Sequence, residues 1–263
     1  MNTHTAIILE TFSNTVEEIN VSKKNITGIL DLKKFTNLIK LSCNHNSITD
    51  IINLPECLQS LECGYNSLTL LNNLPNNLTY LFCSKNKIIS LDNLPNNLTY
   101  LHCSGNKISN LDNLPNSLKA LYCMENSIIS LDYLPSSLEI LRCQNNNIVL
   151  MDNLPKNLIE LECYNNQITH LDNLPNSLKK LDCGYNLIIS LDYLPSSLEV
   201  LKCSNNKIEL LDNLPNNLTY FDCQHNKITH LENLPNKITY LCCAFNPIKN
   251  LDNLPPYLNT LIK

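Results

Sequence analysis

Thirteen cysteines carry the most reactive side chains of this sequence, and eleven of them recur at every twentieth position from Cys43 to Cys243. Thiols could form disulfides, ligate a metal ion or act as nucleophiles. Disulfides and metal sites need side chains that converge, whereas a constant step stacks the thiols along one column. The sequence contains no CxxC pair, and the total is odd. We therefore expect buried, reduced thiols that act as small hydrophobic side chains, with no metal site.

Cys57 and Cys242 lie outside this column. We expect Cys57 on the convex side of the molecule and Cys242 on the outward side of a strand, which makes both better candidates for reactive or crosslinking thiols. A core rich in reduced thiols fits a reducing compartment. The expected location is therefore cytoplasmic, in the cytosol of the source cell or of a host cell.

An acidic column follows the same step of twenty residues: Asp92, Asp112, Asp132, Asp152, Asp172, Asp192, Asp212, Glu232 and Asp252. Aspartates cap backbone N–H groups in turns, which is a sufficient reason for the column. A weak calcium-type site is the alternative. The nearest acid–base pair in the sequence, Asp222 with His225, has no nucleophile to complete a triad. We expect no enzymatic activity and no cofactor.

Composition narrows the class of protein. With 263 residues, 43% of them hydrophobic, the chain can bury a continuous core. Charged residues make up 16%, the formal net charge is −5, and no cluster of Lys or Arg could follow a phosphate backbone. The N-terminus lacks the basic segment of a signal peptide, and no run of eighteen apolar residues occurs. We expect neither nucleic-acid binding nor a membrane segment.

A single unit of twenty residues explains the thiol and acid columns. It reads L-x-C-x-x-N-x-I-x-x-L-D-N-L-P-x-x-L-x-x, and its first Leu recurs from Leu41 to Leu261, with Phe221 as the one replacement. The alternation in L-x-C predicts a short strand, and successive strands should stack in parallel. The Asn that recurs from Asn46 to Asn246 should turn the chain and form a ladder of amide hydrogen bonds.

The Leu-Pro step of each unit shapes the return segment. The residue before Pro avoids the helical region and Pro lacks a donor, so the segment should be extended or a brief turn. The spacing of Leu54, Leu58 and Leu61 also fits one short helical turn that begins near Pro. Both alternatives give the same solenoid.

The segment LQSLECGYNSL (Leu58 to Leu68) matches the pattern LxxLxLxxNxL. On these residues the sequence resembles the leucine-rich-repeat superfamily, over roughly Leu32 to Lys263. The short unit with Leu-Pro resembles the bacterial secreted-effector class typified by YopM and IpaH. The composition of the repeats, rich in Asn and Ile, resembles that of repeat proteins of giant amoebal DNA viruses. The ubiquitin-ligase activity of the IpaH class is not carried over, because the sequence ends at LNTLIK within the repeats.

The resemblance implies a right-handed superhelical solenoid, of α/β type by family and mostly β here. Its parallel sheet should line the concave face, with extended or short-turn convex segments. We expect an N-terminal cap and entry segment over residues 1–30. A solenoid of eleven to twelve units over 31–263 should follow, all in a single domain. Leucine-rich repeats usually bind other proteins through the concave face.

An internal duplication indicates which surface matters. Residues 111–140 and 171–200 differ at six positions, all outward strand positions or the turn just beyond, whereas the exposed convex positions are identical. Free drift of exposed residues predicts convex changes as well, so we favour a contact surface. The candidate protein-binding residues are Tyr65, Tyr80, Phe82, Tyr100, His102, Tyr122, Arg142, Glu160, Glu162, Lys180, Asp182, Lys202, Tyr220, Asp222, Tyr240 and Phe245.

Two functions follow from this interpretation. The favoured one is a module that binds a polypeptide partner, with a charged strip between two aromatic patches; a viral or effector protein acting on host proteins would fit. The alternative explanation for each aromatic residue is structural, because Tyr and Phe favour strands whether or not they bind a partner. The second function is a structural or assembly component that self-associates through the C-terminal edge strand near Leu258 to Lys263.

Overall fold

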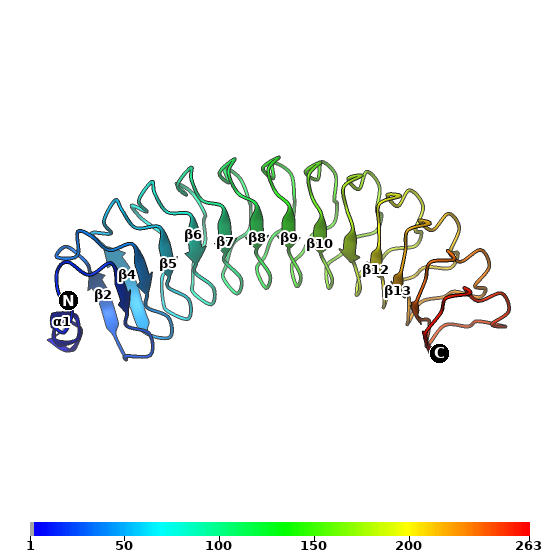
Figure 1. Ribbon diagram of the computed structural model, residues 1–263, viewed down its shortest axis with the longest axis horizontal. Coiled ribbons are helices and arrows are strands. Elements are labelled where there is room, and N and C mark those ends of the chain that lie inside the picture. The colour runs from blue at the N-terminus through cyan, green and yellow to red at the C-terminus, as the bar shows by residue number, and fades with distance from the viewer. Residues whose placement is uncertain (1–2) are drawn as a thin grey trace. The chain divides into compact units, whose positions relative to one another are not determined.

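The computed structural model describes residues 3–263 and consists almost entirely of short strands and turns (Figure 1). Within these residues the one helix is α1 (Thr3–Glu10). The strands are β1 (Glu18–Asn20), β2 (Thr27–Asp31), β3 (Lys40–Ser42), β4 (Ser47–Ile52), β5 (Ser60–Glu62), β6 (Tyr80–Phe82), β7 (Tyr100–His102), β8 (Ala120–Tyr122), β9 (Ile140–Arg142), β10 (Glu160–Glu162), β11 (Lys180–Asp182), β12 (Val200–Lys202), β13 (Tyr220–Asp222), β14 (Tyr240–Cys242) and β15 (Thr260–Ile262).

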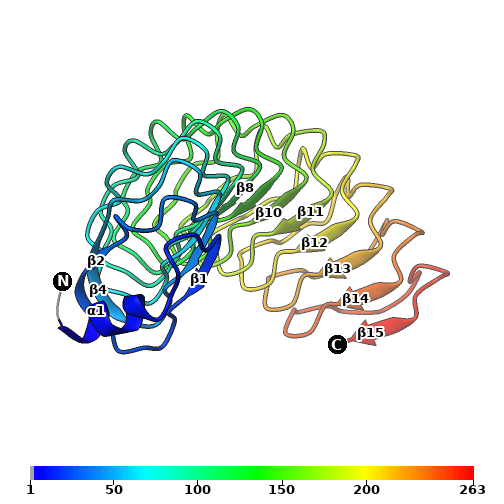
Figure 2. The same ribbon diagram turned by 60° about the vertical axis from the view of Figure 1, so that its left-hand side comes forward.

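The chain forms two compact units, Met1–Ser127 and Ile128–Lys263. In the first unit, β1, β3 and β5 to β8 pair in parallel, in that order, and β2 pairs in parallel with β4 in a small second sheet. In the second unit, each strand from β9 to β15 pairs in parallel with the next. Figure 2 shows β10 to β15 side by side. The predicted, mostly β parallel solenoid is confirmed.

The step of twenty residues sets the register of the sheets, because each strand pairs the same column of the unit. Leu61 aligns with Leu81, and Leu81 with Leu101. The predicted cap of residues 1–30 contains β1, which pairs with β3 in the same manner. The boundary near residue 30 between cap and repeats therefore stays a prediction.

The core of each unit is built from the apolar columns. In the repeat that begins with β6, the side chains of Leu81, Cys83, Ile88 and Leu98 are completely buried. Burial of a Leu or Ile side chain contributes about 1.5–3 kcal/mol, but a single repeat has no second face to cover it. Stability therefore depends on stacking with the neighbouring repeats. All eleven cysteines of the column are buried, as predicted.

The Asn column forms the predicted ladder. The amide of Asn86 donates to the carbonyl of Cys83 in its own repeat at 3.0 Å, and to that of Cys63 in the preceding repeat at 3.0 Å. Its Oδ1 accepts the backbone N–H of Leu68 at 2.9 Å. One side chain thus satisfies three backbone groups that the turn leaves unpaired.

Two positions of each repeat adopt positive φ, which the sequence analysis did not predict. The first is the second residue after the column Cys, as at Lys85 (φ 54). The second is the Asn before Leu-Pro, as at Asn93 (φ 63). Asn tolerates the left-handed region better than most residues, which explains its recurrence in L-D-N-L-P. Tyr133 (φ 68) and Tyr193 (φ 66) occupy this second position without that advantage.

The return segment is extended with one tight turn. The N–H of Leu98 donates to the carbonyl of Pro95 at 3.1 Å, and Leu58 makes the same bond to Pro55 at 3.0 Å. Because the described chain has no helix beyond Glu10, the extended or brief-turn alternative holds and the helical-turn alternative is wrong.

Candidate functional site

The outward side chains of the strands form what we call the strand face of each unit. Each strand from β5 to β15 has the form x-Leu-x, with Phe221 in place of the Leu on β13. The Leu or Phe is inward, so the residues before and after it point outward. Fourteen of the sixteen predicted binding residues occupy such positions on β6 to β14. Tyr65 and Phe245 lie instead in the turn beyond the strand, at its positive-φ position.

On the first unit, the predicted aromatic patch is a continuous cluster. The aromatic cluster comprises Tyr80, Phe82, Tyr100, His102 and Tyr122. The Tyr80 and Tyr100 rings stack at 4.6 Å between centroids, and those of His102 and Tyr122 stack at 5.1 Å. Tilted contacts join Phe82 to His102 at 4.9 Å and Tyr100 to Tyr122 at 5.1 Å. Contacts of this kind favour a defined arrangement of the rings.

A glycine makes room for this cluster. A Cβ atom at Gly64 would overlap the ring of Phe82, so the ring lies against the backbone of the preceding repeat. The phenol of Tyr80 is partly buried, and that burial, followed by the negative charge of Glu62, raises its pKa. The cluster is therefore a packed, partly desolvated surface.

Glu62 is a strand-face residue that the sequence analysis missed. It lies on β5 directly beside Phe82 of β6. Its Oε2 accepts hydrogen bonds from Ser42 Oγ at 3.2 Å and Asn44 Nδ2 at 2.9 Å. The sequence marks this position only by its place in the outward column, because its neighbours in space come from other repeats.

On the second unit, the predicted charged strip is a network of ion pairs. Arg142 Nη2 lies 2.7 Å from Glu160 Oε1 and 3.2 Å from Glu162 Oε1. Lys180 lies 3.9 Å from Glu160, and Lys202 lies 3.8 Å from Asp182. These side chains line a hollow of about 300 Å³ on the strand face. Burial raises the pKa of Glu162 and of Asp182, against the opposing effect of the nearby cations.

The second aromatic patch consists of two separate ring pairs. Tyr220 and Tyr240 stack at 4.2 Å on adjacent strands, with Lys202 Nζ 6.0 Å from the Tyr220 ring centroid. Burial raises the pKa of Tyr220. His225 and Phe245 stack at 4.1 Å in the turns beyond these strands.

The turn positions add aromatic residues that were not predicted as binding residues. On the second unit, Tyr164 is 37% exposed and Tyr185 is 58% exposed. They follow Glu162 and Asp182 of the charged strip by two and three residues. On the first unit, His45 stacks on Tyr65 at 4.2 Å. The signal was present in the sequence, because Tyr185 and Phe245 share one column of the repeat.

The two off-column cysteines differ from the prediction in accessibility. Cys242 is on the outward side of β14 but is only 3% exposed, and burial raises its pKa. It aligns with Asp222 and Ile262 on the two adjacent strands, whose side chains are longer. Its expected accessibility was wrong. Cys57 is half-buried, and its Sγ donates to the carbonyls of Thr36 and Leu38 at 3.2 and 3.3 Å.

The acidic column lies in exposed turns. Ser190 Oγ donates to Asp192 Oδ2 at 2.5 Å and accepts the Asp192 backbone N–H at 3.1 Å, a pattern repeated at Ser130 and Asp132. Here the Ser hydroxyl accepts the backbone N–H and the Asp carboxylate accepts the Ser hydroxyl, so turn capping by the Asp side chains themselves stays a prediction. Across the described residues, no three His, Cys, Asp or Glu side chains are placed to hold a metal ion.

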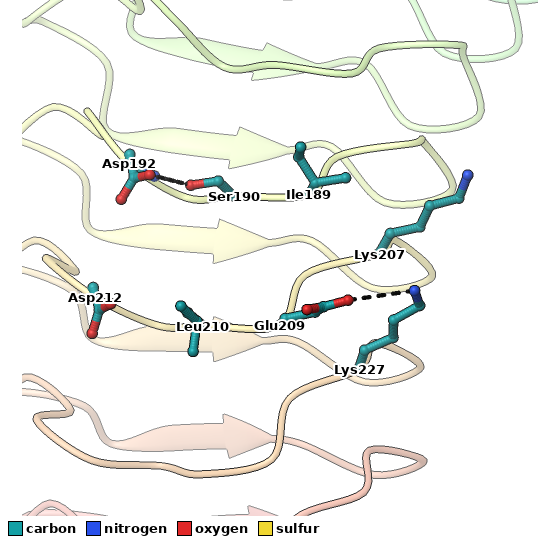
Figure 3. Close-up of a pocket in the computed structure, with 8 residues that line it drawn as sticks. All are labelled: Ile189, Ser190, Asp192, Lys207, Glu209, Leu210, Asp212 and Lys227. Carbon is teal, nitrogen blue, oxygen red and sulfur yellow. Dashed lines mark hydrogen bonds and ion pairs between the residues drawn. The ribbon is translucent and has the colours of Figure 1, made fainter.

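One hollow of about 410 Å³ borders these turns in the second unit (Figure 3). It is lined by Ile189, Ser190, Asp192, Lys207, Glu209, Leu210, Asp212 and Lys227. Lys227 lies 3.5 Å from Glu209, and the apolar side chains of Ile189 and Leu210 are largely exposed. The hollow is open to solvent and lies outside the strand face. Over residues 3–263, no helix has the length and apolar character needed to cross a bilayer.

The structure is similar to several solved solenoids. YopM from Yersinia enterocolitica matches with a TM-score of 0.81 and 29% sequence identity, over 94% of this chain and 62% of that one. A functional domain of InlJ from Listeria monocytogenes, described as including a cysteine ladder, matches with a TM-score of 0.76 and 31% identity, over the same shares. The leucine-rich repeat domain of APL1B matches with a TM-score of 0.78 and 22% identity, over 99% of this chain and 85% of that one.

This chain spans 62% of the length of the YopM and InlJ structures that it matches. No protein-family model and no curated protein sequence matches it. The comparisons therefore bear on the fold and on the general class of function.

Proposed function

Because this chain has the fold of leucine-rich-repeat proteins, we propose that it is a non-enzymatic protein-binding module that holds a polypeptide partner on its strand face. The aromatic cluster of the first unit carries this proposal. Its five rings are in continuous contact and only partly buried. Packed aromatic side chains supply much of the binding energy of protein interfaces, since they lose little conformational entropy on binding.

The duplicated segments support the choice of surface. Of the six positions that differ between 111–140 and 171–200, three lie at outward positions on strands and three in the turn that follows a strand. The exposed turns on the opposite side, such as Tyr133 and Tyr193, are identical. Drift of solvated residues would have changed both surfaces.

The class of partner and its location are also part of the proposal. A related structure is described as that of a leucine-rich effector protein from Yersinia pestis, which supports a host protein as partner. A giant viral source, the other resemblance, leads to the same class of partner. The buried thiol column supports a reducing, cytoplasmic location. Self-association through β15 stays a prediction, and light scattering over a concentration series tests it.

The test compares a triple variant of the aromatic cluster with a double control variant. Each is used to capture partners from host lysate. Tyr80→Ala, Phe82→Ala and Tyr100→Ala together should leave the fold intact and abolish capture of a specific partner. Tyr133→Ala with Tyr193→Ala is the matched control, because both rings are 81% exposed and lie off the strand face. Capture that survives the triple substitution, or that is lost in the control, contradicts the proposal.

A further inference from the structure

The strand face of the first unit has one charged group without a counterion. The outward positions of β5 to β8 are Ser60, Glu62, Tyr80, Phe82, Tyr100, His102, Ala120 and Tyr122, which include one carboxylate and no Lys or Arg. Lys40 on the adjacent strand β3 pairs with Glu18 at 2.8 Å, and Lys85 in the turn after β6 pairs with Glu125. No ion pair to Glu62 forms within residues 3–263.

The second unit provides the contrast. There the strand-face carboxylates of Glu160, Glu162 and Asp182 each have a Lys or Arg within 4.0 Å. The fourth, Asp222, instead accepts hydrogen bonds from the backbone and the side chain of Gln224. A carboxylate that is half-buried loses hydration, and this loss is normally offset by a cation or by hydrogen bonds. The first unit supplies Glu62 with hydrogen bonds alone.

These hydrogen bonds hold the carboxylate in a fixed position and use only one of its oxygens. Ser42 Oγ and Asn44 Nδ2 both donate to Oε2, so Oε1 has no partner in the described chain. Asn44 is fixed in turn, because its Oδ1 accepts the backbone N–H of Gly64 at 2.7 Å. A ligand therefore meets a preorganised acceptor, which lowers the entropic cost of binding.

Aromatic rings border this acceptor. Phe82 lies directly across from Glu62 on the adjacent strand, and Tyr80 is the next outward residue of that strand. A ring face attracts a cation, and a guanidinium group can stack on a ring while its N–H groups bond a carboxylate. An ammonium group is more strongly hydrated and lacks the planar shape for stacking.

Resting on the proposed function, we propose that Glu62, Tyr80 and Phe82 form a recognition site for an arginine side chain of the polypeptide partner. Glu62 Oε1 accepts hydrogen bonds from the guanidinium group, and the rings cover its face. The rest of the aromatic cluster then binds apolar side chains that flank the arginine. The partner is thus a protein segment with an exposed arginine among hydrophobic residues.

The experiment selects binding peptides and then removes the positive charge from the peptide and the negative charge from Glu62. Random dodecapeptides are selected on the purified full chain. Each selected peptide is remade with citrulline, which has the shape of arginine without its charge, and with lysine, which has the charge without the planar shape. We expect selected peptides to share an arginine, and the citrulline form to bind about tenfold more weakly. On Glu62→Gln, which can still accept the Ser42 and Asn44 bonds, the two forms should bind about equally.

Glu56→Gln is the matched control, because Glu56 is an exposed carboxylate in the return segment of the first unit. It should keep the full preference for arginine. Thermal melts of both variants establish that the fold is unchanged. Equal binding of arginine and citrulline peptides, equal binding of arginine and lysine peptides, or a preference that persists in Glu62→Gln would each overturn the inference.

The selection also separates this inference from the proposed function. Peptides that depend on Tyr80, Phe82 and Tyr100 but show no dependence on arginine or Glu62 leave the strand face as the binding surface and refute only the arginine site. Peptides that bind equally to the triple aromatic variant refute both.

Discussion

The ring of Phe82 lies where a side chain at Gly64 would be, so the two residues fit each other across adjacent repeats. Gly64→Ala should therefore displace the ring and lower the free energy of unfolding by about 1–3 kcal/mol, the usual cost of overpacking. Urea unfolding measures this change. Gly184→Ala is the control, because its Cβ would approach the mobile Ser204 Oγ at 3.0 Å.

A double variant shows whether the cost comes from this contact. With Phe82→Ala in the background, Gly64→Ala should cost much less, since the atom with which Cβ overlaps is gone. The same penalty in both backgrounds would show that the backbone of Gly64, rather than the ring, resists the substitution.

Asn166 gives the second prediction. Its amide donates to the carbonyls of Cys163 at 2.9 Å and Cys143 at 3.1 Å, and its Oδ1 accepts the N–H of Ile148 at 3.0 Å. Asn166→Ala leaves these buried groups unpaired and should lower the free energy of unfolding by about 3 kcal/mol. Asn176→Ala, on an exposed turn, should change it by less than about 0.5 kcal/mol. Similar values for the two variants would contradict the structural role of the ladder.

The sequence predicts the parts of this fold that depend on one repeat and its copies. The columns of Leu81, Cys83 and Asn86 follow from the period, because a constant step forces identical neighbours above and below each residue. The outward direction of Tyr80 and Phe82 follows from the alternation of a strand. Such features need no knowledge of particular side-chain conformations.

Features that depend on unlike neighbours were missed. Whether Glu62 has a counterion depends on side chains from other repeats, and Lys40 and Lys85 pair with Glu18 and Glu125 instead. Cys242 is outward by alternation but is buried between its two neighbouring strands. The positive φ of the L-D-N-L-P position was hidden by the many other roles that Asn plays in turns.

Tyr133 and Tyr193 give the third prediction. Nine other repeats place Asn at this positive-φ position, and Tyr gains nothing there from burial, since each ring is 81% exposed. Tyr133→Asn should raise the free energy of unfolding by about 0.5–1 kcal/mol, because Asn tolerates the left-handed region. Tyr193→Asn should add a similar amount. Thermal or urea unfolding measures the free energy of unfolding of each variant. A loss of stability would mean that the rings make contacts that stabilise the turns.

The raised pKa of Asp182 gives the fourth prediction. Burial is the main cause, so the folded chain binds a proton more readily than the unfolded chain, whose Asp has a pKa near 3.8. This group's contribution to stability therefore declines as pH rises from about 4 through the raised pKa. Asp182→Asn removes this dependence while its Oδ1 can still accept the Gly184 N–H, a 3.3 Å bond in the parent chain.

The measurement is the difference in free energy of unfolding between Asp182→Asn and the parent chain at several pH values from 4 to 7. We expect the variant to gain relative stability as pH rises across this window. Asp212→Asn, on an exposed turn, should show a flat difference. A flat difference for Asp182→Asn as well would mean that Lys202, 3.8 Å away, compensates the burial of the carboxylate.

Thiol reactivity gives the fifth prediction. Burial raises the pKa of Cys63, Cys103 and Cys143 to about 12, so these side chains hold almost no thiolate at neutral pH. Cys57 is half-buried in the return segment. Iodoacetamide should therefore modify Cys57 first in the native chain, while the column reacts only on unfolding. Peptide mapping by mass spectrometry identifies the modified positions.

Two variants complete this test, because exposure and chain mobility both affect labelling. Cys57→Ser should remove the fast phase of labelling and leave the slow phase unchanged. Asn166→Ala, which weakens the ladder beside Cys163 and Cys143, should speed the slow phase at those two thiols. Fast labelling anywhere in the column of the parent chain would show that the repeats open locally, and would remove the basis for treating these thiols as inert core.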